Sequence, residues 1–174
     1  MTAMELDKEL VGKFIDAVVN DEPQAVRLLR QYPELRDARW RLNETVLHFL
    51  AIEGYTEGVR RLCQMGFDVN ATNEFGDAPL IDVAVLGNDE IAAILIEHGA
   101  DPNATSETHD NALHCAVQSG NAKLVDVVLL AGAKSDYETP LGETIFDALP
   151  VKPDKRRAIE EVLARHGIQA DQGL

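Results

Sequence analysis

APLIDVAVLGNDEIAAILIEHGADPN, residues 78–103, contains one complete unit of a motif that recurs along the chain. A short turn leads into an apolar segment, Gly87 interrupts it, and a second apolar segment ends at Gly99. Glycine often ends a helix because it adopts a left-handed backbone without a side-chain clash. The order of apolar segments and glycines therefore predicts two short helices that run back against each other.

The unit recurs every 33 residues, which is the interval from Leu47 to Leu80. Matches at this interval are Phe14, Leu113 and Phe146 for Leu80, Gly66 and Gly132 for Gly99, Asn70 for Asn103, and Leu50, Ala116 and Leu149 for Val83. Such a period is characteristic of a protein built from stacked repeats. Each unit of the stack packs only on its neighbours, so the chain needs no central core.

The repeated motifs resemble those of ankyrin repeats, in which Thr-Pro-Leu-His-x-Ala and a glycine precede an outer helix ending in Gly-Ala-Asp-x-Asn. The first motif reads Thr45-Val46-Leu47-His48, Ala78-Pro79-Leu80-Ile81, Asn111-Ala112-Leu113-His114 and Thr144-Ile145-Phe146-Asp147. The second reads Gly66-Phe67-Asp68-Val69-Asn70, Gly99-Ala100-Asp101-Pro102-Asn103 and Gly132-Ala133-Lys134-Ser135-Asp136. The resemblance implies an all-α solenoid of stacked helix-turn-helix units with short β-turn or hairpin loops. Ile81 and Asp147 replace the family's histidine, so we expect an incomplete hydrogen-bond network in those units.

Residues 1–174 are predicted to form a single ankyrin-repeat domain. We place its units at about 6–38 (N-terminal cap), 39–71, 72–104, 105–137 and 138–170 (C-terminal cap). The fifth unit gains two residues around Pro150, which we place between its two helices. Asn43 and His109 stand where the third unit has Gly76, and asparagine tolerates the left-handed backbone that such a turn needs.

The formal net charge of −14 argues against binding to a nucleic-acid backbone, which requires clustered lysine and arginine. The charge is also unevenly distributed, since no lysine or arginine occurs between Arg61 and Lys123. That span contains ten acidic residues: Asp68, Glu74, Asp77, Asp82, Asp89, Glu90, Glu97, Asp101, Glu107 and Asp110. We therefore expect a negative field around the middle of the stack.

No catalytic nucleophile motif, phosphate-binding loop or dinucleotide fingerprint is present. His98 and His109 lie near acids, but their spacing matches no common metal motif. Cys63 and Cys115 are expected to remain reduced, with Cys63 as a packing residue. The chain is therefore predicted to be non-catalytic, with no metal and no cofactor.

His48 and His114 occupy the family's histidine position, and we interpret them as structural hydrogen-bonding residues. Trp40 either anchors a partner or packs the first turn onto the cap, and we favour packing. No apolar run approaches the roughly 20 residues of a membrane span. The N-terminal residues do not resemble a secretory signal, so we expect a cytoplasmic protein that does not bind membranes.

The resemblance also implies a binding site, because ankyrin proteins usually bind partners through their turn tips and inner-helix surface. Carried over by register, the candidate residues are Leu42, Glu44, Ile52, Glu53, Glu74, Phe75, Asp77, Val85, Leu86, Glu107, Asp110 and Gln118, with Pro140, Leu141 and Glu143 in the fifth unit. Phe75, Val85 and Leu86 stand out as apolar residues among acids, which is typical of a hot spot with a charged rim. The alternative is that Phe75 packs on a neighbouring turn and that the next repeat partly buries the other two.

The leading hypothesis is a monomeric protein–protein interaction module that binds a basic protein through a concave acidic face. A sharper version is an inhibitor or immunity-type protein that neutralises a basic enzyme or toxin. Two alternatives belong to other classes: a metal- or ligand-binding regulator or enzyme, and a scaffold without a dedicated partner.

Overall fold

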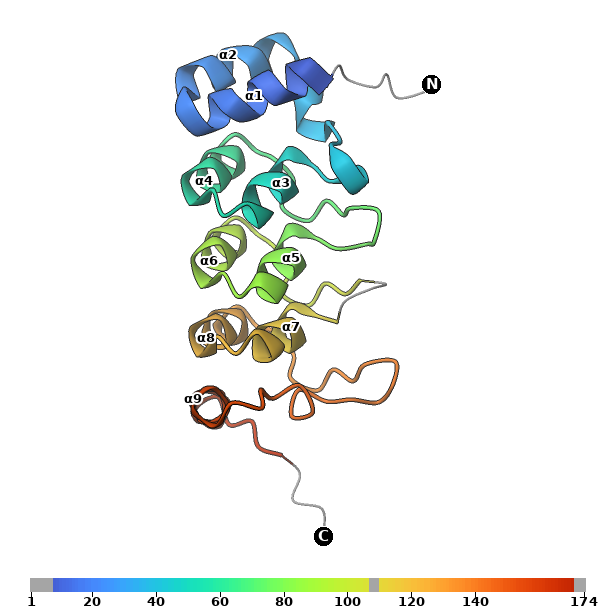
Figure 1. Ribbon diagram of the computed structural model, residues 1–174, viewed down its shortest axis with the longest axis vertical. Coiled ribbons are helices and arrows are strands. Elements are labelled where there is room, and N and C mark those ends of the chain that lie inside the picture. Colours follow the sequence, from blue (N-terminus) through green and yellow to red (C-terminus); the bar gives the residue numbers. More distant parts are fainter. Residues whose placement is uncertain (1–7, 107–109, 171–174) are drawn as a thin grey trace.

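The computed structural model describes residues 8–106 and 110–170, which form a stack of paired helices (Figure 1). The α-helices of these residues are α1 (Lys8–Asn20), α2 (Glu22–Gln31), α3 (Val46–Ile52), α4 (Thr56–Gln64), α5 (Pro79–Leu86), α6 (Asp89–Glu97), α7 (Ala112–Ser119), α8 (Ala122–Leu130) and α9 (Pro153–Arg165). Two short 3-10 helices, η1 (Pro33–Asp37) and η2 (Arg41–Asn43), connect α2 to α3. The described residues contain no regular strand, so the predicted all-α solenoid is confirmed.

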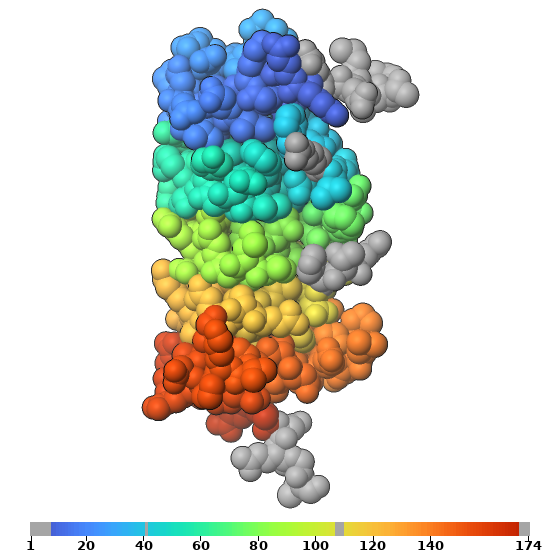
Figure 2. All heavy atoms as spheres, in the orientation of Figure 1, coloured from blue at the N-terminus to red at the C-terminus, as the bar shows by residue number. Residues whose placement is uncertain are grey.

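Helices α3, α5 and α7 lie between α4, α6 and α8 on one side and the projecting loops on the other (Figure 1). We call α1, α3, α5 and α7 the inner helices, and α2, α4, α6 and α8 the outer helices. The space-filling view shows the units as successive layers in contact along the stack (Figure 2).

The core is a continuous row of apolar side chains between inner and outer helices. The inner-helix positions predicted from the period, Phe14, Leu47, Leu80 and Leu113, are all buried. The outer helices repeat the same pattern with Leu29, Leu62, Leu95 and Val128. Burying such a side chain contributes about 1.5–3 kcal/mol, which compensates for the low stability of helices this short.

Glycine and asparagine make the sharp reversal between helices. Gly87 ends α5 and Gly120 ends α7 with φ of 73° and 75°, respectively. The following residues, Asn88 and Asn121, cap α6 and α8 by accepting hydrogen bonds from backbone N–H groups in the first helical turn. Asn121 Nδ2 also donates to the Gly87 carbonyl at 2.8 Å, so this cap links adjacent units.

A second asparagine position connects the closing loops of successive units. Asn70 Nδ2 donates to the Gly99 carbonyl at 2.9 Å, and Asn70 Oδ1 accepts from the Asp101 N–H at 2.8 Å. Asn103 makes the equivalent pair of bonds to Gly132 and Lys134 at 3.1 and 2.8 Å. This arrangement gives a physical reason for asparagine at the end of the repeated motif.

The turn tips are closed by the same backbone bond in three units. The donor and acceptor pairs are Trp40 N to Glu44 O at 2.7 Å, Asn73 N to Asp77 O at 3.0 Å, and Thr139 N to Glu143 O at 2.9 Å. The predicted left-handed backbone at Asn43 is confirmed, with φ of 55°. Leu42 is also left-handed, with φ of 52°, which the sequence did not predict.

The fifth unit differs from the prediction of two helices. Residues 145–148 form turns, and only α9 is helical. A helix beginning at Ile145 would meet Pro150 within two turns, and proline disfavours helical backbone at the residue before it. Asp147 instead stabilises the turn, since its Oδ2 accepts from the Thr144 N–H and hydroxyl at 2.8 and 2.9 Å.

Candidate functional site

Four of the candidate residues are apolar and are exposed at the surface. Leu42, Phe75, Val85 and Leu86 are 54%, 38%, 44% and 57% exposed. Leu42 and Phe75 lie at turn tips, whereas Val85 and Leu86 form the C-terminal end of α5. Each of these side chains keeps solvent-exposed apolar surface, although the fold covers the rest of it. We call the turn tips and the C-terminal ends of α3, α5 and α7 the tip-and-helix face.

The apolar tip residues share one position of the repeat. Leu42, Phe75 and Leu141 are separated by one and two periods, and Leu141 is 85% exposed. The sequence analysis selected all three by this register, and the structure shows that each is exposed. The equivalent position of the fourth unit, Thr108, lies outside the described residues.

Acidic side chains connect the tips to the helix ends. The pKa of Glu44 is raised by partial burial and by repulsion from Glu53 and Glu74. Glu44 and Glu74 belong to turn tips, whereas Glu53 caps the C-terminal end of α3. The two parts of the tip-and-helix face therefore share one negative field.

Asp77 does not belong to an exposed rim, contrary to the prediction. Its side chain is buried, with only 1% of the residue exposed. His48 Nε2 donates to the Asp77 carbonyl at 3.0 Å, and the Asp77 N–H donates to Asn73 Oδ1 at 3.1 Å. Asp77 therefore has a structural position between the second and third units.

The remaining predicted residues vary in accessibility. Glu53, Glu74 and Gln118 are exposed, and Ile52 is half-buried. Asp110 is partly buried, and Glu107 lies outside the described residues.

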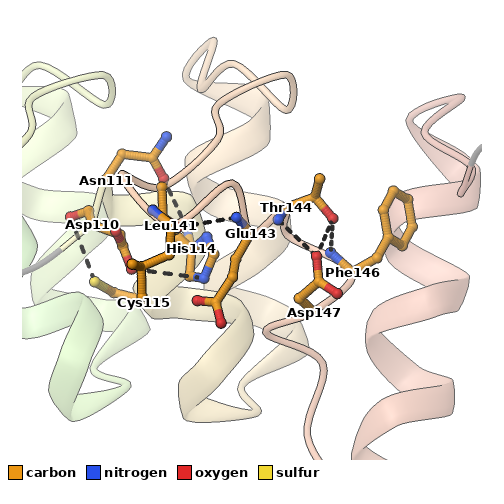
Figure 3. Close-up of polar contacts among 10 residues, drawn as sticks. Asp110, Asn111, His114, Cys115, Leu141, Glu143, Thr144, Phe146 and Asp147 are labelled. Carbon is orange, nitrogen blue, oxygen red and sulfur yellow. Dashed lines mark hydrogen bonds and ion pairs between the residues drawn. The ribbon is translucent and has the colours of Figure 1, made fainter.

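Asp110 lies in a polar cluster between the fourth and fifth units (Figure 3). Its Oδ2 is 3.7 Å from His114 Nε2, and its carbonyl accepts from Cys115 Sγ at 3.7 Å. Within the described residues, buried His114 Nδ1 has no hydrogen-bond partner. The predicted hydrogen-bonding role is confirmed for His48, whose Nδ1 accepts from the Thr45 N–H at 3.2 Å. For His114 it stays a prediction.

Several other candidates have packing roles. The Trp40 ring lies 6.4 Å from the Phe49 ring at 60°, so Trp40 packs on α3 of its own unit, whereas the prediction placed it against the cap. Cys63 and Cys115 are buried, and burial raises their pKa to about 11 and about 12, respectively, so both thiols remain protonated at neutral pH. In the described part of the chain, no group of three or more histidine, cysteine or acidic residues could hold a metal ion.

A family model for ankyrin repeats, in three copies, matches residues 14–106 and 47–140. The chain therefore belongs to the ankyrin-repeat family, whose members are generally protein–protein interaction modules and typically non-catalytic. Comparison with curated proteins found no significant match. Among residues 8–106 and 110–170, no helix is both long and apolar enough to span a bilayer.

Proposed function

We propose that this chain is a non-catalytic interaction module that binds a basic protein through the tip-and-helix face. The proposal is carried by one observation. Phe75, Val85 and Leu86 are exposed within a span, from Arg61 to Lys123, that contains no other lysine or arginine. An apolar cluster of this kind supplies binding energy, and the surrounding acids select the charge of the partner.

The exposed apolar residues are better explained by binding than by folding. Removing apolar surface from water contributes about 25 cal/mol per Å², and these side chains leave much of that contribution unrealised. Leu42 also has a left-handed backbone, which costs a residue with a Cβ about 1–2 kcal/mol. Strain of this type at an exposed apolar residue is typical of a binding loop.

The electrostatics favour a cationic partner. The pKa of Glu44 is raised by partial burial and by repulsion from Glu53 and Glu74. A lysine or arginine placed beside them would relieve this repulsion and accelerate encounter. Association should accordingly become slower and weaker as the salt concentration rises.

Affinity capture from a lysate of the source organism tests this proposal. Wild-type protein is compared with Phe75→Ala/Leu86→Ala and with the control Leu130→Ala/Val151→Ala. The control removes two apolar side chains that are 74% and 96% exposed at the end of α8 and before α9. Both double variants should fold, because all four side chains contact solvent.

The proposal predicts a basic protein that wild type and control retain with saturable binding and that the Phe75/Leu86 variant loses. An activity assay of a captured enzyme would then distinguish an inhibitor from an adaptor. Equal retention by wild type and both variants would refute the tip-and-helix face as the binding site.

A further inference from the structure

A hollow of about 250 Å³ opens between α1 and α3, next to the tip-and-helix face. Ile15 and Val19 of α1 line it together with Phe49 of α3, and all three are partly buried. Pockets for drug-sized ligands measure about 300–1,000 Å³, so this space suits a single side chain. No residue of α1 was predicted to belong to a site.

Two carboxylates lie at the exposed edge of this apolar hollow. Asp16 and Glu53 both line it, and both are exposed, in contrast to the apolar walls. Asp16 Oδ1 accepts from Asn20 Nδ2 at 2.8 Å. Over residues 8–106 and 110–170, no lysine or arginine forms an ion pair with either carboxylate. The hollow therefore combines apolar walls with two acids that no described cation neutralises.

This combination complements a long basic side chain. Lysine and arginine place an aliphatic stem on apolar surface and keep the charged group at its polar edge. The rings of Phe49 and Tyr55, which also line the hollow, can contribute cation–π attraction. A neutral apolar side chain would fit the walls but would leave both carboxylates without a partner.

Gly12 keeps one wall of the hollow open. It lies in the middle of α1 and lines the hollow, and a Cβ at this position would meet no atom within 4 Å. Glycine lowers the stability of a helix interior, and neither a positive φ nor close packing requires it here. The space left by the missing side chain is therefore available to a ligand.

We propose that this hollow receives a lysine or arginine side chain of the basic partner. The inference rests on the proposed function and deepens it, because Glu53 belongs both to the hollow and to the tip-and-helix face. The partner would then contact the apolar tips and insert one cationic side chain between the first two units.

The test titrates the full chain with three short peptides, Ac-Gly-Arg-Gly-NH2, Ac-Gly-Lys-Gly-NH2 and the neutral citrulline analogue of the first. Amide chemical shifts of Gly12 and Tyr55 report occupancy. We expect saturable shifts with one or both cationic peptides, and which of them binds identifies the preferred side chain. The citrulline peptide should give no saturable shift.

Two variants alter the hollow, and a third serves as a matched control. Asp16→Asn/Glu53→Gln should weaken binding by about fivefold, the order of two exposed ion pairs. The control Glu34→Gln/Asp37→Asn makes the same charge change at exposed positions of η1, away from the hollow, and should bind as wild type does. Gly12→Leu, at a position where an added Cβ would meet no atom within 4 Å, should fill the hollow and abolish the Tyr55 shift.

The proposal that the hollow binds a cationic side chain is refuted by any of three results. These are no saturable shift with either cationic peptide, equal binding of the citrulline peptide, or equal binding by the Asp16/Glu53 variant and its control. These titrations need no partner, so their failure is separate from failure of the capture experiment. Peptide binding without dependence of capture on Phe75 and Leu86 would refute the proposed function instead.

Discussion

At the scale of single residues, His48 connects two units through a buried imidazole. Its Nε2 donates to the Asp77 carbonyl, and its Nδ1 accepts from the N–H of Thr45. Only the neutral imidazole can make both bonds, because a protonated ring has no acceptor. Burial accordingly lowers the pKa of His48 to about 4.

This lowered pKa predicts a specific loss of stability in acid. Between about pH 6.5 and pH 4 the unfolded chain binds a proton that the folded protein does not, so the free energy of unfolding falls as pH falls. From pH 7 to pH 4.5 we expect His48 to account for about 2 kcal/mol of the loss. Denaturant unfolding at both pH values checks this against His48→Gln, which cannot titrate. Equal losses in the two proteins would contradict the assignment.

Leu42 presents a trade-off between stability and binding. Leu42→Gly should raise the free energy of unfolding by about 0.5–1 kcal/mol, because glycine relieves the left-handed strain but gains entropy when unfolded. The same change should weaken partner binding, because it removes an exposed apolar side chain. Denaturant unfolding measures the first effect and titration with the captured partner the second. A destabilised variant would show that Leu42 packs on the fold.

At the scale of helices and turns, the period predicted which positions are buried. Phe14, Leu47, Leu80 and Leu113 needed only their spacing, because the same helix packs on the same neighbour in each unit. The turns were less predictable. Register places Asp77 at a tip but does not determine that its side chain is buried there. The fifth unit has no helix before Pro150, because only four residues lie between Ile145 and this proline.

The helix pairs also predict the cost of a core truncation. Leu95 in α6 is fully buried in the row that includes Leu62 and Val128. Leu95→Ala should lower the free energy of unfolding by about 2–5 kcal/mol, whereas Leu130→Ala, at an exposed end of α8, should change it by less than about 0.5 kcal/mol. Denaturant melts of the two variants provide the comparison. A loss below about 0.5 kcal/mol for Leu95→Ala would contradict the register.

At the scale of the whole molecule, charge and shape act together. Asn70 and Asn103 join the closing loops of successive units, and the Glu74 N–H donates to the Leu42 carbonyl at 3.2 Å between two turn tips. A partner therefore meets a largely pre-organised surface. The span from Arg61 to Lys123 adds ten acids and no cation between its ends. The sequence alone predicted this charge pattern, whereas the hollow beside α1 needed the side-chain packing of two units.

The most direct test of the account is the dissociation constant of the captured partner for wild type and for Phe75→Ala, measured by calorimetry. We predict that Phe75→Ala weakens binding by about thirtyfold, which is about 2 kcal/mol, and that Val151→Ala leaves it unchanged. Equal dissociation constants for wild type and Phe75→Ala would contradict the central claim that the tip-and-helix face binds the partner.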